Sequence, residues 1–270
     1  MKFSHAKFLF LFIFVASLPI QASAKGLVIS PKRVVFEKGQ RIVEVILANR
    51  GDEEETYRIS IVNKRMQENG QLTDATTPAE NEFFAKDHLR YSPRQVVLGP
   101  KETQKVRLMS RLKSDAADGE YRSHLLIQEV PKADAAQKAD AAEDGALGIN
   151  VQAIFGISLP VIMRKGDLVA QTSLSSPKIK KIGEDTYLEV EINRTGTKSI
   201  LGSLNVFAEE QKIGILKTVA VYMSSPKRVV SIKLDPERAK NLSGKTLRVT
   251  LGAEEAIEDA PETEISFTAP

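Results

Sequence analysis

Residues 149–166 read INVQAIFGISLPVIMRKG, and the pattern of this stretch governs how the rest of the chain is interpreted. Every odd position from 149 to 163 is apolar, whereas the even positions mix polar and apolar residues. Successive side chains of a β-strand point to opposite faces, so the alternation predicts a strand with one continuous apolar face. Fifteen residues at roughly 3.3 Å each span about 50 Å, whereas an ordinary strand has about five or six residues. The stretch is therefore either an overlong core strand or a strand that extends past its own sheet.

Pro160 restricts where in a sheet this strand can lie. Proline has no backbone N–H, so it is found at sheet edges and bulges rather than in central strands. A long edge strand exposes unpaired backbone groups, which recruit a further strand, often from another protein. An ordinary core strand and a strand made for pairing with a partner both fit the pattern.

The first residues have the features of a secretory signal peptide, which we place at residues 1–24. Lys2 and Lys7 form a positive segment, residues 8–20 are largely apolar, and Ala22-Ser23-Ala24 supplies the small residues of a cleavage site. The apolar run is shorter than the about 20 residues of a membrane span. We therefore expect a cleaved signal, a mature protein in the periplasm, and no membrane insertion after cleavage.

The charge balance does not favour nucleic-acid binding. The chain has 38 basic and 35 acidic residues, and removal of Lys2 and Lys7 leaves 36 and 35, a net charge near +1. No basic stripe with interleaved aromatic residues occurs in the sequence. The chain also has no cysteine, which excludes disulfides, thiolate metal sites and cysteine nucleophiles.

Strand-like segments separated by turn residues run through the whole chain and predict an all-β protein. About seven such segments lie between residues 27 and 163, the number typical of an immunoglobulin-like β-sandwich, and the pattern restarts after Asp167. Residues 132–148 are rich in Ala, Lys, Asp and Glu without an apolar face, which predicts a mobile loop. We therefore expect one sandwich domain at 25–165, with its last strand at 149–163, and a second at 166–270.

Nothing in the sequence favours catalysis, a metal or a cofactor. His88 and His124 are the two histidines outside the leader, neither has a second ligand at metal-type spacing, and we expect both at the surface or a sheet edge. Nucleophile-elbow, phosphate-loop and zinc-protease motifs are absent from the sequence. The lack of tryptophan also disfavours a sugar-stacking enzyme, so we expect a non-enzymatic protein.

Several segments, in order and spacing, resemble the periplasmic pilus (fimbrial) chaperones of the PapD type. The resemblance covers residues 27–165, and the second domain matches in size and class only. The segments are SPKRVVF (30–36), VILAN (45–49), the run from Pro93 through Gly99-Pro100 to Val106-Arg107-Leu108, EYRSHLLIQEVP (120–131), and the 149–166 stretch in the place of the last strand of the first domain.

The resemblance implies two immunoglobulin-like domains in an L or boomerang arrangement and a mechanism of strand donation. Pilus subunits lack one strand, and a chaperone of this family completes their sandwich with its own alternating strand. The equivalent subunit-binding positions in this chain are Ile149, Val151, Ala153 and Phe155. The implied partners are pilus subunits and an outer-membrane usher, and self-capping as a dimer is a further expectation.

The resemblance also implies a carboxylate anchor for the subunit, with Arg33 as the cleft arginine. A gapless alignment places Ser158 where the family has a lysine, with Pro160 close by, while Arg164 and Lys165 lie about 20 Å further along the strand. Three possibilities remain: Arg33 anchors alone, another residue supplies the second charge, or the client is not held by its carboxylate. This departure favours an alternative function, a two-sandwich structural or bridging protein that donates no strand.

Overall fold

The computed structural model describes residues 26–36, 39–131, 153–255 and 258–270. These residues form β-strands and one short 3-10 helix, η1 (Lys86–His88). The all-β fold class expected from the sequence is confirmed. The strands are β1 (Leu27–Ser30), β2 (Val34–Phe36), β3 (Ile42–Asn49), β4 (Glu55–Val62), β5 (Lys64–Met66), β6 (Leu72–Asp74), β7 (Leu89–Ser92), β8 (Gln95–Leu98), β9 (Thr103–Ser110), β10 (Gly119–Glu129), β11 (Gly156–Lys165), β12 (Ala170–Ile182), β13 (Asp185–Gly196), β14 (Ile200–Ala208), β15 (Gln211–Val221), β16 (Lys227–Lys233), β17 (Thr246–Gly252) and β18 (Thr263–Thr268).

The first eleven strands build one sandwich and a small hairpin. One layer has the strand order β1-β3-β9-β7 and the other has the order β2-β11-β10-β4-β8. Side chains that alternate along these strands fill the space between the layers; in β4, Tyr57, Ile59 and Ile61 are buried. The β5–β6 hairpin stands apart from both layers as a two-stranded sheet.

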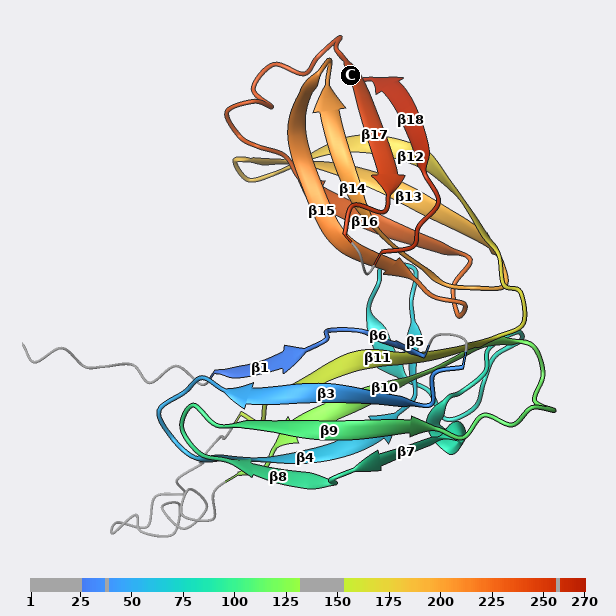
Figure 1. Cartoon of the computed structure of the whole chain (residues 1–270). Helices are drawn as coiled ribbons and strands as arrows, with labels where there is room; N and C mark the ends of the chain where they lie inside the picture. Colours follow the sequence, from blue (N-terminus) through green and yellow to red (C-terminus); the bar gives the residue numbers. More distant parts are fainter. Residues whose placement is uncertain (1–25, 37–38, 132–152, 256–257) are drawn as a thin grey trace, which may run out of the picture.

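The last seven strands build a second sandwich. Its layers have the orders β12-β13-β16 and β15-β14-β17-β18. In β13 the alternation is strict, with Leu188, Val190 and Ile192 fully buried between more exposed neighbours. Figure 1 shows this sandwich standing on one end of the first, with its strands running across the direction of the strands below, which is the angled two-domain arrangement expected.

β11 lies between two partners for only part of its length. It pairs antiparallel with β10 from Gly156 to Lys165, and parallel with β2 only from Val161 to Met163. The predicted strand of residues 149–163 therefore begins later than expected: residues 153–155 are not in a strand, and 149–152 lie outside the described residues. The expected alternation is present in the strand itself, because Leu159, Val161 and Met163 all point into the first core.

Contacts from β5 and β11 join the two sandwiches. Met66 of β5 and Ile162 of β11 are buried in the hydrophobic core of the second sandwich. Glu68, just after β5, accepts a backbone hydrogen bond from Val229 of β16 at 2.7 Å. Figure 1 shows the β5–β6 hairpin between the two bodies. The two sandwiches therefore share buried apolar contacts rather than only a linker.

Among the described residues, no helix has the length and apolar character needed to cross a membrane.

Candidate functional site

Among the described strands, the first half of β11 pairs on one side only. Between Gly156 and Pro160 this strand pairs with β10 on one side, while β2 reaches only Val161 to Met163 on the other. The ladder also extends backwards, since the Glu129 amide donates to the Phe155 carbonyl at 2.9 Å. In the described part of the chain, no strand pairs with the second side of Gly156–Pro160. This edge offers backbone groups to a strand from outside.

Large apolar side chains surround this edge and are exposed to solvent. Phe155 is 63% exposed, Ile154 52% and Ile157 42%, whereas Leu159, two residues further on the same face as Ile157, is only 3% exposed. The apolar face of the strand therefore continues beyond the core that it covers. Exposed apolar side chains gathered beside a free sheet edge mark a surface that binds another chain.

The structure describes two of the four predicted subunit-binding residues. Ala153 and Phe155 are exposed and directly precede β11. Ile149 and Val151 lie outside the described residues. Ile157 was not among the four, although its odd position in the alternating stretch was a signal that the same surface includes it.

Arg33 lies on the side of the five-stranded sheet that faces the second sandwich. It precedes β2, and Val35, which shares its face, packs against the second core. Arg33 is 8% exposed, and its Nε, Nη1 and Nη2 atoms are buried without a hydrogen-bond partner in the described part of the chain. A buried charged group without partners costs several kcal/mol, about the penalty that a bound anion would remove. Arg33 is thus suited to hold an anionic ligand.

His124 is also buried between the sandwiches, and the expectation of a surface or edge histidine is wrong. It lies on β10 with 0% exposure, and its ring is perpendicular to the ring of Tyr222 at 6.2 Å. Burial, followed by the charges of Arg122 and Lys64, lowers the pKa of His124 to about 3, so the imidazole is neutral at pH 7. The sequence could not indicate this, because the residues that cover His124 belong to the second sandwich.

Tyr222 interacts with charged residues at the junction between the two sandwiches. The Arg122 guanidinium lies 4.1 Å from its ring centroid, a cation–π contact. Burial raises the pKa of the Tyr222 hydroxyl, while the positive charges of Arg122 and Arg33 act in the opposite direction. Arg33 is therefore close enough to Tyr222 to act on it electrostatically, which places both residues at the same junction.

Arg164 forms ion pairs that connect the two sandwiches. Its guanidinium contacts Glu120 at 3.0 Å and Asp259, from the second sandwich, at 2.8 Å. The Glu120 carboxylate also accepts the Ser199 amide at 3.1 Å. Arg164 is therefore already paired with carboxylates from both sandwiches.

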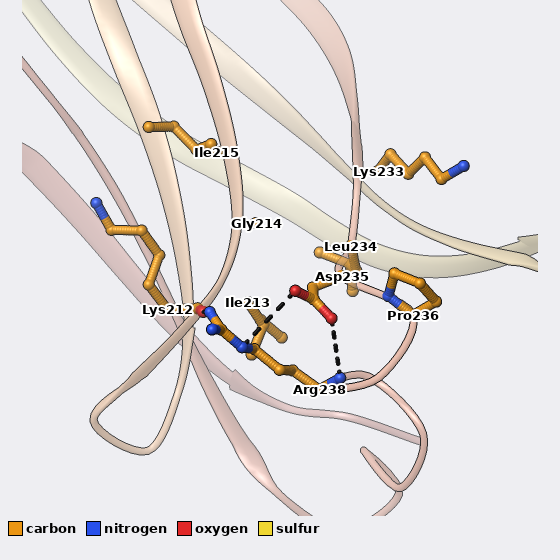
Figure 2. A pocket seen from close by; sticks show the side chains of 9 residues that line it. All are labelled: Lys212, Ile213, Gly214, Ile215, Lys233, Leu234, Asp235, Pro236 and Arg238. Atoms are coloured by element: carbon orange, nitrogen blue, oxygen red, sulfur yellow. Dashed lines mark hydrogen bonds and ion pairs between the residues drawn. The ribbon is translucent and has the colours of Figure 1, made fainter.

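One pocket lies in the second sandwich, away from β11. This pocket has a volume of about 390 Å³ and lies beside β15 and the end of β16. Figure 2 shows that Asp235 turns toward Arg238, with which it forms an ion pair at 3.7 Å. Lys233 points away from this pocket in the same view. Within the described ranges, no group of three or more His, Cys, Asp or Glu side chains is placed to hold a metal ion.

Comparison with solved structures finds several chaperones that this chain resembles at low sequence identity. Solved structures of similar fold include the YadV chaperone, with 14% identity, 89% of this chain and 99% of that chain covered, and a TM-score of 0.49. The Acinetobacter baumannii CsuC–CsuE chaperone–tip adhesion subunit complex has 12% identity, coverages of 88% and 98%, and a TM-score of 0.48. A Salmonella enterica complex of the SafA pilin with the SafB chaperone has 10% identity, coverages of 90% and 97%, and a TM-score of 0.44.

No curated protein sequence matches this chain. The model of the pili and flagellar-assembly chaperone family, PapD N-terminal domain, matches residues 26–164. This match spans the whole first sandwich and just over half of the 270 residues. The chain therefore belongs to the family of pili and flagellar-assembly chaperones.

Proposed function

We propose that this chaperone binds pilus subunits by donating the strand that begins at β11, with the residues before β11 as part of the donated segment. The observation that carries the proposal is the free edge at Gly156–Pro160, flanked by exposed Phe155 and Ile157. In strand addition, unpaired backbone groups supply affinity and alternate apolar side chains fill pockets of the partner. This edge of β11 provides both.

The donated segment includes Ile149, Val151, Ala153 and Phe155, and we add Ile157. Their odd positions continue the row that Leu159 begins in the first core. Each large aliphatic or aromatic side chain that a client buries contributes about 1.5–3 kcal/mol, and Ala153 contributes less. Three or four such residues together contribute roughly 5–12 kcal/mol, from which the cost of association is subtracted.

Arg33 is the proposed anchor for the terminal carboxylate of the subunit. Its buried guanidinium has no acceptor in the described part of the chain, and a carboxylate supplies two acceptor oxygens for charge-assisted hydrogen bonds. Arg33 is only 8% exposed, so an incoming carboxylate has to displace the atoms that cover it. The anchor would fix the register in which the client lies along β11.

The proposal includes the cellular setting expected from the sequence. The protein acts in the periplasm after cleavage near residue 24, and it delivers its client to an outer-membrane usher. The exposed apolar side chains of the donor segment also make self-capping by a second copy a reasonable resting state, because an apolar surface of this kind is unstable in water.

A co-purification experiment tests strand donation. We expect the tagged protein, recovered from its own host, to retain a pilus subunit. Phe155→Glu or Ile157→Glu should abolish this retention, because the client's groove would then have to bury a carboxylate. Ile182→Glu is a matched control, since Ile182 is 62% exposed at the end of β12, in the second sandwich.

The thermal midpoint of all three variants should remain that of the parent, because each replaces an exposed side chain. Retention of the subunit by both donor-segment variants would exclude strand donation and favour the bridging alternative.

A further inference from the structure

The family-type lysine is missing from the donor strand, and the fold indicates which residue stands near its place. Val34 pairs with Val161, so Arg33 lies level with Pro160 on the neighbouring strand. On the other side of β11, Pro160 pairs with His124 of β10. Arg33 and His124 therefore flank Pro160 on the same side of the sheet, about 10 Å apart at their backbones, since neighbouring strands are about 4.8 Å apart.

The polar atoms around Pro160 are buried and unsatisfied. All three guanidinium nitrogens of Arg33, both ring nitrogens of His124 and the Ser158 hydroxyl have no hydrogen-bond partner in the described ranges. Such atoms are rare in folded proteins, because each one loses its bonds to water without replacement. Six of them around one residue indicate a missing ligand rather than six separate defects.

The neighbouring Arg122 differs from Arg33, because only its Nη1 atom lacks a partner in the described ranges. Arg122 donates through Nη2 to the Lys64 carbonyl at 2.9 Å and to the Ser224 hydroxyl at 3.3 Å. Its guanidinium also stacks on the ring of Tyr222. Arg122 is thus held at the junction by its own contacts, whereas none of the guanidinium nitrogens of Arg33, which is level with Pro160, has a partner in the described ranges.

We propose that His124, assisted by the Ser158 hydroxyl, completes the anion site of Arg33, and that the site takes the carboxylate at the end of a polypeptide, held over Pro160. This inference rests on the proposed role of Arg33 as the client anchor. Arg33 supplies the positive charge, while His124 and Ser158 donate neutral hydrogen bonds to the second oxygen. A proline at the centre suits this arrangement, since its ring offers no competing donor.

Nuclear magnetic resonance of the histidine rings tests the proposal directly. The probes are N-acetyl-trialanine with a free carboxylate, the same peptide as its C-terminal amide, and acetate. We expect the free-acid peptide to shift the His124 ring signals in a saturable way and acetate to do so more weakly. The amide should have no effect, and His88 serves as the internal control in each spectrum.

The variants separate this role from a structural one. His124→Leu should weaken binding of the free-acid peptide roughly 10- to 100-fold, because a hydrogen bond to a charged group is lost. It should leave the thermal midpoint equal or higher, since an unsatisfied buried ring is removed. His124→Gln keeps a neutral N–H donor and should retain most of the affinity, and Arg33→Met should abolish binding.

Three results would overturn the proposal. Peptide binding that depends on Arg33 but not on His124 would leave the anchor correct and this inference wrong. Equal binding of acetate and the free-acid peptide would exclude recognition of a chain end. No response of His124 to any probe would also refute the inference, while loss of subunit retention in the Phe155 and Ile157 variants would still support strand donation independently.

Discussion

His124 makes the stability of the protein sensitive to mildly acidic pH. Its pKa in the folded protein is about 3, against an ordinary 6.5, chiefly because the ring is buried and secondarily because Arg122 and Lys64 are nearby. Below pH 6.5 the unfolded chain therefore binds a proton that the folded chain does not. The free energy of unfolding should fall by up to about 1.4 kcal/mol per pH unit from 6.5 down toward 3.

Urea unfolding of the parent and of His124→Gln between pH 7 and pH 4.5 measures this effect. The variant should lose the part of the slope that begins near pH 6.5, and His88→Gln should keep it. Equal slopes for the parent and His124→Gln would mean that the buried ring does not resist protonation.

The Glu120–Arg164–Asp259 group is the second feature at the scale of single residues. The Glu120 side chain is fully buried, so removing its cation leaves a buried charge held by the Ser199 amide without its ion pair. Arg164→Met should lower the free energy of unfolding by about 3 kcal/mol, measured by urea titration at pH 7. Lys180→Met removes an exposed pair with Glu189 and should cost less than about 1 kcal/mol, so comparable losses would contradict this account.

At the scale of elements, β11 changes from a core strand to an exposed one within a few residues. Leu159 is 3% exposed and Ile157 is 42% exposed on the same face. Leu159→Ala should therefore destabilise the protein by about 2–5 kcal/mol, while Ile157→Ala should cost less than about 0.5 kcal/mol. Chemical denaturation of the two variants gives both values, and a large loss for Ile157→Ala would place this residue in the core.

The sequence predicts the alternation of side chains in β11, but not the residue at which the strand begins. Periodicity of two identifies which side chains share a face, and Leu159, Val161 and Met163 do share one. Whether a residue on that face is covered depends on where the opposite sheet ends, which no local pattern reports. The prediction of one strand from 149 to 163 therefore placed its beginning too early among the described residues.

β10 presents the opposite difficulty. Glu120, Arg122 and His124 alternate with Tyr121 and Leu125, a pattern typical of one solvated and one buried face. Both faces are buried in the structure, because the second sandwich covers the polar one. In a sequence, polar residues that line a junction between domains have the same pattern as a solvent-exposed face. The structure therefore corrects the expectation that His124 lies at the surface or a sheet edge.

At the scale of the molecule, the two sandwiches should unfold together. Met66 and Ile162 come from the first sandwich but are buried in the core of the second, so either body exposes apolar surface when the other unfolds. We expect a single transition in differential scanning calorimetry for the parent protein. The double variant Met66→Ala with Ile162→Ala should separate it into two, because each truncation removes about 2–5 kcal/mol from the shared contacts.

Leu108→Ala is the matched control for this coupling. Leu108 is fully buried in the first core and takes no part in the junction. Leu108→Ala should lower the midpoint temperature of the single transition without dividing it into two. Two transitions in the parent protein would show that the shared contacts are too weak to couple the domains.

The sequence by itself determined the all-β class, the two sandwiches, the family-like order of segments and the parity of the donor strand. These follow from local rules, since side-chain alternation and turn residues depend on neighbours along the chain. Only the tertiary structure decided that Gly156–Pro160 pairs on one side among the described strands, that Arg33 and His124 flank Pro160, and that both are buried. Burial and cross-strand neighbours depend on segments distant in the sequence, and here on a second domain packed over the first.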